Sequence, residues 1–101
     1  SVDFTRLGQL TFQKPNYKKF PSLALGIDVG RRGGTLPAVL NAADEMAVDA
    51  FLNRCLPFTG IYRTVEKVVQ KHKVTDRPSF TQILDADQWA RQEAGRLIKE
   101  R

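Results

Sequence analysis

The sequence contains few of the residues from which catalytic and metal sites are usually built. It has one cysteine, Cys55, and one histidine, His72. A single cysteine excludes a disulfide within the chain. A lone imidazole with no second histidine and no paired cysteine at ligand spacing argues against a zinc site. We therefore expect His72 to be a solvated or positively charged residue at the C-terminal end of a helix.

Motifs for nucleotide binding and for covalent catalysis are also missing. The sequence has no P-loop, no dinucleotide fingerprint and no G-x-S-x-G elbow. Asp44 and Glu45 are adjacent, so their side chains lie about 100° apart on a helix and do not converge. Asp85 and Asp87 also point apart, and Asp87 is better placed to pair with Arg91 at i,i+4. We predict no catalytic, cofactor-binding or metal-binding residue and no paired base and nucleophile.

Long apolar runs and a signal-peptide pattern are absent, so we expect neither a membrane span nor secretion, and we expect a cytoplasmic location. The first residue is Ser1 and the only methionine is Met46. This start predicts a processed, trimmed or partial product. The 101 residues are enough for about one small domain with one modest core.

Basic residues outnumber acidic ones by 16 to 11, which gives a formal net charge of +5. A basic domain can bind nucleic acid. Here the cations are spread from Arg6 to Arg101 and fall at predicted helix ends or on helix faces. We therefore expect a solvated surface and no nucleic-acid partner. A free-standing basic helical module that binds nucleic acid or a protein remains the alternative.

Apolar residues recur at three- and four-residue steps in four segments, which predicts an all-α, four-helix bundle-like domain. The first helix starts at Pro21 and stops before Gly33 and Gly34, which cap it and reverse the chain. The second is the central core helix. Its predicted core stripe is Leu36, Val39, Leu40, Ala43, Met46, Ala47, Ala50 and Phe51. The last helix is long and amphipathic, with a predicted stripe of Phe80, Ile83, Leu84, Asp87, Ala90, Ala94, Leu97 and Ile98.

Helix starts are predicted from capping residues. Thr35 and Thr59 are candidate N-caps of the second and third helices. Ser79 and Gln82 fit the capping box, in which each side chain satisfies a backbone donor of the other residue.

The second face of the central helix carries two polar residues one turn apart, Asn41 and Glu45, between apolar neighbours. We expect them to form a local polar contact where this helix meets the arm or a connection. A buried polar group without a partner would cost stability.

Residues 1–20 differ from the rest, because they are rich in aromatics but show no sustained helical period. We interpret them as an extended linker or arm and residues 21–101 as the helical bundle domain. An arm this apolar must lie on something. We expect Phe4, Phe12 and Tyr17 to pack across a domain boundary, although the arm could also pack on its own bundle.

The central segment also carries a family resemblance. Its residues Leu40-Asn41-Ala42-Ala43-Asp44-Glu45-Met46-Ala47-Val48 are followed by Ala50-Phe51-Leu52 and Phe58-Thr59-Gly60-Ile61. Upstream stand Val2-Asp3-Phe4, Leu10-Thr11-Phe12, Pro15, Tyr17, Phe20-Pro21 and Leu23. In this order the chain resembles the C-terminal region of the 1-deoxy-D-xylulose 5-phosphate reductoisomerase family over essentially its whole length. Asp44 stands where that family usually has Asn.

The resemblance implies a structural C-terminal helical domain of such an enzyme. The family rearranges and reduces deoxyxylulose phosphate to methylerythritol phosphate for isoprenoid precursor synthesis, with NADPH and magnesium or manganese. Its cofactor, metal and phosphate sites belong to regions before the part that this chain resembles, so none of those residues carries over. The implied partners are the N-terminal and catalytic domains of the same enzyme, in a homodimeric parent.

Overall fold

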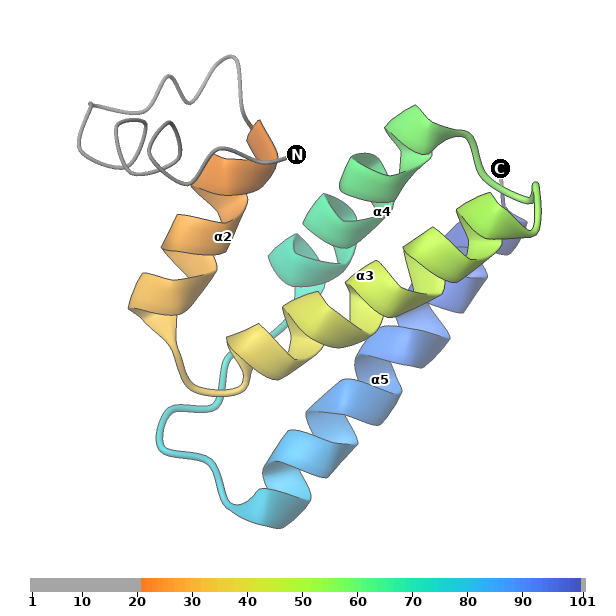
Figure 1. Ribbon diagram of the computed structural model, residues 1–101. Helices are drawn as coiled ribbons and strands as arrows, with labels where there is room; N and C mark the ends of the chain where they lie inside the picture. The colour runs from red at the N-terminus through yellow and green to blue at the C-terminus, as the bar shows by residue number, and fades with distance from the viewer. Residues whose placement is uncertain (1–20, 101) are drawn as a thin grey trace, which may run out of the picture.

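The computed structural model describes residues 21–100, which form four α-helices and no strand (Figure 1). The helices are α2 (Pro21–Arg32), α3 (Leu36–Leu52), α4 (Phe58–Lys71) and α5 (Phe80–Lys99). The predicted all-α, bundle-like fold is therefore confirmed. Residues 1–20 lie outside the described part, so the predicted arm and its boundary with the bundle remain predictions.

Helix α3 is the centre of the domain and packs against α2, α4 and α5 (Figure 1). Its buried residues are Leu36, Val39, Ala42, Ala43 and Ala47. Most of these belong to the predicted core stripe, because a helix contacted from several sides buries most of its apolar surface. Phe51 was also predicted to belong to the core stripe, but it lies at the surface. It is 36% exposed and makes an edge-to-face contact with Phe58, with ring centroids 5.7 Å apart.

Helix α5 faces the core with only part of the predicted stripe, because Ala90 and Ala94 are buried and Leu97 and Ile98 pack against the core, as predicted. Its buried residues are Ala86, Ala90 and Ala94, which recur every four residues. Phe80 and Leu84, both expected in the core, are 73% and 52% exposed. Small residues at these positions let α5 pack closely on α3. Gly95 of α5 also faces α3, since an added Cβ would make ordinary contact with Met46 Cε at 3.7 Å. This orientation turns the two bulky side chains outward.

Two of the three predicted residues stand at the N-cap position, Ser79 and Thr35, and only Ser79 also forms the capping hydrogen bonds. Ser79 N–H donates to Gln82 Oε1 at 2.9 Å and Gln82 N–H donates to Ser79 Oγ at 3.2 Å, which is the predicted capping box. The prediction for Thr59 was wrong. Thr59 as N-cap would start the helix at Gly60, but α4 begins two residues earlier, at Phe58, after Pro57, whose extended backbone (φ −71°, ψ 160°) leads directly into the first turn.

The prediction for Thr35 needs a different correction. Thr35 does stand at the N-cap position of α3, but its backbone is helical (φ −80°, ψ −8°) and its side chain caps nothing. An N-cap residue normally has an extended backbone, which aims its oxygen at the free N–H groups of the first turn. The Thr35 hydroxyl instead points to another part of the chain.

Candidate functional site

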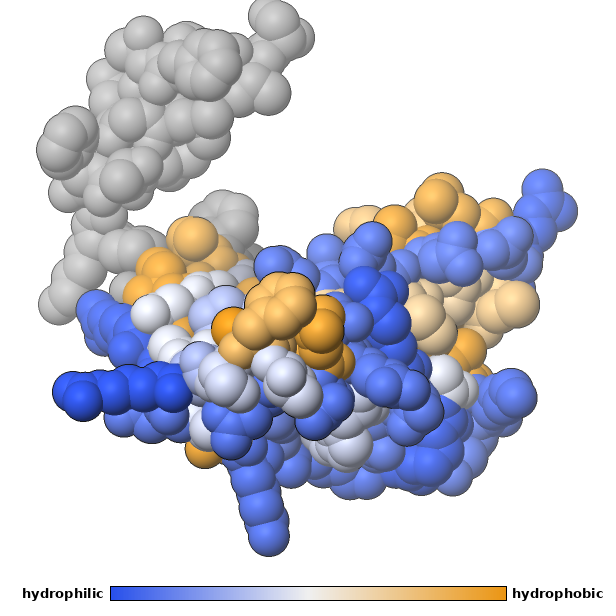
Figure 2. Space-filling model, turned by 90° about the horizontal axis from the view of Figure 1, so that it is seen from below, coloured by the Kyte–Doolittle hydropathy of each residue, from blue (hydrophilic) through white to orange (hydrophobic). Residues whose placement is uncertain are grey.

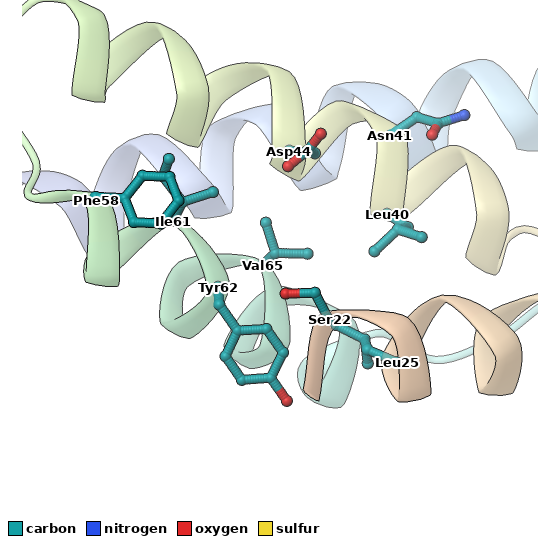
Figure 3. Close-up of a pocket in the computed structure, with 9 residues that line it drawn as sticks. All are labelled: Ser22, Leu25, Leu40, Asn41, Asp44, Phe58, Ile61, Tyr62 and Val65. Atoms are coloured by element: carbon teal, nitrogen blue, oxygen red, sulfur yellow. The ribbon is translucent and has the colours of Figure 1, made fainter. Parts of the chain in front are cut away.

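A groove opens between helices α2, α3 and α4 and encloses about 300 Å³. Figure 3 shows side chains from all three helices around it. They are Ser22 and Leu25 from α2, Leu40, Asn41 and Asp44 from α3, and Phe58, Ile61, Tyr62 and Val65 from α4. The groove thus combines an apolar surface with a few polar groups, as small binding sites often do.

The groove exists because α2 is anchored at one end only. Val29, near the C-terminal end of α2, is the residue of this helix that the core buries. Leu25, one turn earlier, is partly buried against the core, and Leu23 is 48% exposed. In Figure 1 both α2 and α4 lie beside α3, and the start of α2 stands apart from α4. The first turns of α2 therefore form one wall of a groove instead of completing the bundle.

The predicted pair of Asn41 and Glu45 does not form within residues 21–100, so this prediction was wrong there. Asn41 is exposed and lines the groove. Glu45 turns away and accepts a hydrogen bond from Arg91 Nη2 of α5 at 2.6 Å. The guanidinium offers Glu45 a charged partner, which an amide cannot match. A contact of Asn41 with the arm falls on residues outside the described part.

Arg91 holds two carboxylates at once. Besides Glu45 it contacts Asp87, with Nε and Oδ2 3.0 Å apart, which confirms the i,i+4 pair that the sequence predicts. The hydrogen bonds that Arg91 donates to Asp87 and then to Glu45 raise its pKa. These groups are well exposed, and exposed ion pairs contribute only about 0–1 kcal/mol each. The cluster therefore orients side chains across α3 and α5 more than it stabilises the fold.

A second polar cluster ties the turn between α2 and α3 to the loop between α4 and α5. The Thr35 hydroxyl lies 2.7 Å from His72 Nε2 and accepts a hydrogen bond from the backbone N–H of Thr75 at 3.0 Å. In return, the N–H of Thr35 donates to the carbonyl of Thr75 at 3.1 Å. Thr35 is only 1% exposed. We call these contacts of Thr35, His72 and Thr75 the threonine lock.

The lock holds His72 in a partly buried site. Besides accepting the Thr75 N–H, the Thr35 hydroxyl forms a second hydrogen bond with His72 Nε2, whose direction depends on the tautomer of the ring. Burial first, and then the charge of Arg32, lower the pKa of His72 below its ordinary value of 6.5. The ring also lies against Trp89, with centroids 5.2 Å apart. The predicted solvated or charged histidine was therefore wrong, because tertiary packing supplies partners that the local sequence does not show.

A hydroxyl beside an imidazole resembles a nucleophile with its base, and the sequence predicted no such pair. The Thr35 oxygen, however, is buried and carries a backbone hydrogen bond, so a substrate carbonyl cannot reach it. Gly34 closes the same region. Its φ is +61°, and a Cβ there would overlap the Thr75 carbonyl oxygen. The geometry makes this pair a structural joint between two loops.

Ion pairs join α4 to α5 at another position. Glu93 of α5 accepts a hydrogen bond from Lys71 Nζ of α4 at 2.8 Å and also contacts Arg96. Arg96 in turn lies 2.7 Å from Glu100. Hydrogen bonds from Arg96 and then from Lys71 lower the pKa of Glu93 to about 2. Sequence reasoning missed the contact of Lys71 with Glu93, because the two residues are 22 positions apart.

Several large apolar side chains remain on the surface. Leu52 and Phe58, on either side of the connection between α3 and α4, are 70% and 73% exposed, and Val48 and Phe51 lie on the preceding turns of α3. Figure 2 views the molecule from below and shows separate apolar areas among hydrophilic ones. Exposed apolar groups gathered at one corner are typical of a contact surface.

Within residues 21–100, no group of three or more His, Cys, Asp or Glu side chains is arranged to hold a metal ion. In the same residues, none of the helices is both long and apolar enough to cross a bilayer. The predicted contacts of Phe4, Phe12 and Tyr17 lie outside the part of the chain that the structure describes.

Comparison with known sequences gives a consistent result. The family described as "DXP reductoisomerase C-terminal domain" matches residues 1–93. The 1-deoxy-D-xylulose 5-phosphate reductoisomerase of a Synechococcus species is 48% identical over 99 residues, which are 98% of this chain and 25% of that protein. The reductoisomerase of Desulfosudis oleivorans is 50% identical over 96 residues, which are 95% of this chain and 25% of that protein.

A solved structure gives the same match in three dimensions. The 1-deoxy-D-xylulose 5-phosphate reductoisomerase from Zymomonas mobilis, in complex with NADPH, aligns with a TM-score of 0.75 at 39% identity. The alignment covers 97% of this chain and 26% of that chain. The chain thus spans about a quarter of the length of the relatives that it matches.

Proposed function

The chain belongs to the DXP reductoisomerase C-terminal domain family, and on this premise we propose that it is the structural C-terminal domain of a 1-deoxy-D-xylulose 5-phosphate reductoisomerase. The observation that carries the proposal is the share of this chain and of each relative that the alignments cover. Nearly the whole chain aligns with only about a quarter of each full-length relative. A free-standing basic module would be expected to match proteins of its own length, so that alternative is not favoured.

Residues 21–100 do not fit the cofactors that the family implies. NADPH needs a glycine turn between a strand and a helix that is open to phosphate. The turn at Gly33 and Gly34 joins two helices, and Gly34 faces the Thr75 carbonyl. A magnesium or manganese ion needs convergent oxygen ligands, and residues 21–100 present no such cluster. The proposal therefore assigns rearrangement of the substrate and its reduction with NADPH to the rest of the enzyme.

The role proposed for this domain is a rigid surface that braces the linker and the catalytic domain. Its partners are the N-terminal and catalytic domains of the same chain, in a cytoplasmic homodimer that binds no nucleic acid. Phe4 and Phe12, with Tyr17, would contact those domains across the boundary. The exposed corner around Leu52 and Phe58 offers a second apolar contact surface, and burying it would remove these large side chains from water.

The first test compares this chain alone with the full-length enzyme. The isolated chain should neither turn over substrate with NADPH nor bind NADPH in a titration that follows the fluorescence of the nicotinamide. The full-length protein should do both. NADPH-dependent turnover by the isolated chain would refute a purely structural role.

The second test separates the two possible places of the arm. The double substitution Phe4→Ser and Phe12→Ser is made both in the full-length enzyme and in residues 1–101 alone. If both aromatics pack across the boundary, unfolding of the full-length enzyme should lose about 1.5–3 kcal/mol per buried ring, and turnover per folded molecule should persist. The isolated chain should be nearly unaffected. An equal loss in the isolated chain would mean that both rings pack on their own bundle.

A further inference from the structure

The groove between α2, α3 and α4 is apolar, open and placed at the point where the described chain begins. Its lining starts with Ser22, the second residue of α2. Phe20 therefore lies two residues from a groove-lining position. Two residues span at most about 7 Å. This distance is short enough for an aromatic side chain at residue 20 to reach the rim of the groove.

The size and the surface of the groove suit this side chain. A cavity of about 150 Å³ lined by apolar groups can hold a benzene ring, and the groove encloses about 300 Å³. Leu40 and Ile61 are partly buried and Val65 is buried, so they offer a ring an apolar surface that is already held in place. Figure 3 shows Leu40, Ile61 and Val65 projecting toward the space between the helices.

The charges at the groove match the residues before Phe20. The carboxylate of Asp44 lies at the groove, and Lys18 and Lys19 directly precede Phe20. Lysine side chains can lay their apolar stems along such a surface while the ammonium group reaches an acidic partner. Because the groove lining combines an acidic residue with apolar ones, it favours binding of a segment with basic and aromatic residues over binding of an acidic segment.

We propose that Lys18–Phe20 of the same chain dock into this groove, with the Phe20 ring against Leu40, Ile61 and Val65 and a lysine ammonium near Asp44. The docked segment completes the packing of α2, whose first turns are otherwise held weakly. It also sets the direction in which the chain leaves the bundle toward residue 1. This inference concerns the bundle itself and does not depend on the proposed enzymatic context.

Nuclear Overhauser spectra of the whole chain, residues 1–101 with labelled methyl groups, test the contact directly. Cross-peaks are expected between the Phe20 ring and the methyl groups of Leu40, Ile61 and Val65. Their absence in the folded chain would overturn the proposal. Cross-peaks found only between copies in an isotope-filtered mixture of labelled and unlabelled chains would overturn it as well, because the occupant would then be a second copy.

Matched substitutions test the energetics of the same contact. Phe20→Ser should lower the folding equilibrium constant about tenfold or more, whereas Phe80→Ser, at an exposed aromatic of α5, should change it by less than about threefold. Asp44→Lys should weaken the Phe20 cross-peaks, and Asp85→Lys on the exposed face of α5 should leave them unchanged. Equal effects of Phe20→Ser and Phe80→Ser on the folding equilibrium constant would refute docking. If Phe20→Ser does not fold, the presence or absence of the Phe20 cross-peaks in the unsubstituted chain tests the docking instead.

Discussion

Replacing Thr35 by valine removes the hydroxyl from the threonine lock while keeping the shape of the side chain. The substitution leaves the Thr75 N–H and His72 Nε2 without their partner in a site where Thr35 is only 1% exposed. An unsatisfied buried polar group costs about 1–3 kcal/mol. We therefore expect the free energy of unfolding to fall by about 1–3 kcal/mol, which would lower Tm by roughly 4–8 °C per kcal/mol in a domain of this size.

The chain offers its own control and its own probe for this experiment. Thr59→Val makes the same chemical change at an exposed position that caps no helix, so stability should stay within about 0.5 kcal/mol. Trp89 is the only tryptophan and lies against His72, so its fluorescence can follow urea unfolding at the lock. If Thr35→Val unfolds at the same urea concentration as the unsubstituted chain, the hydrogen bonds of the lock contribute no stability and the reasoning fails.

The lock also makes stability depend on pH. Burial and then Arg32 lower the pKa of His72 in the folded state, so the unfolded chain takes up a proton first as the pH falls. The contribution is fully present above the ordinary pKa of 6.5 and decreases as the pH drops below it. We expect lower stability at pH 5.5 than at pH 7.5, and a smaller difference in His72→Gln. An equal difference in both proteins would refute this origin.

Three further substitutions follow from the fold and can be measured by urea unfolding. Ser79→Ala removes one half of the capping box and should cost about 1 kcal/mol; no change would mean that the box is not formed in solution. Gly34→Ala places a side chain at φ +61° against the Thr75 carbonyl and should cost at least about 1–3 kcal/mol, whereas Gly30→Ala, with open space around it, should not destabilise. Asn41→Ala should change stability by less than about 0.5 kcal/mol, because Asn41 is exposed and unpaired with Glu45, and a loss above 1 kcal/mol would restore a structural role for this amide.

The helices could be predicted from the sequence because their signals are local. Apolar periodicity marks α3, and the box of Ser79 and Gln82 marks the start of α5, since both depend on residues within a few positions of each other. The orientation of α5 could not be predicted in the same way. Phe80 and Leu84 are more hydrophobic than the alanines beside them, yet close approach of two helices selects the small residues.

The site residues were harder to predict for a related reason. The residues next to them in the sequence predict an N-cap for Thr35 and a solvated or charged helix end for His72. Their actual partners are each other and Thr75, which stand 37 and 40 positions from Thr35. Likewise Glu45 finds Arg91 46 positions away and leaves Asn41 in the groove. These polar side chains form hydrogen bonds with residues that are distant in the sequence, and a single sequence carries little information about such pairs.

The threonine lock has a consequence for how long the folded domain survives. Its hydrogen bonds close a loop of 40 residues and can form only after the helices on both sides have been brought together. Contacts that form after the folding transition state have little effect on the rate of folding and act mainly on the rate of unfolding. Loss of the lock in Thr35→Val should therefore raise the rate of unfolding more than it lowers the rate of folding, and so shorten the lifetime of the native state.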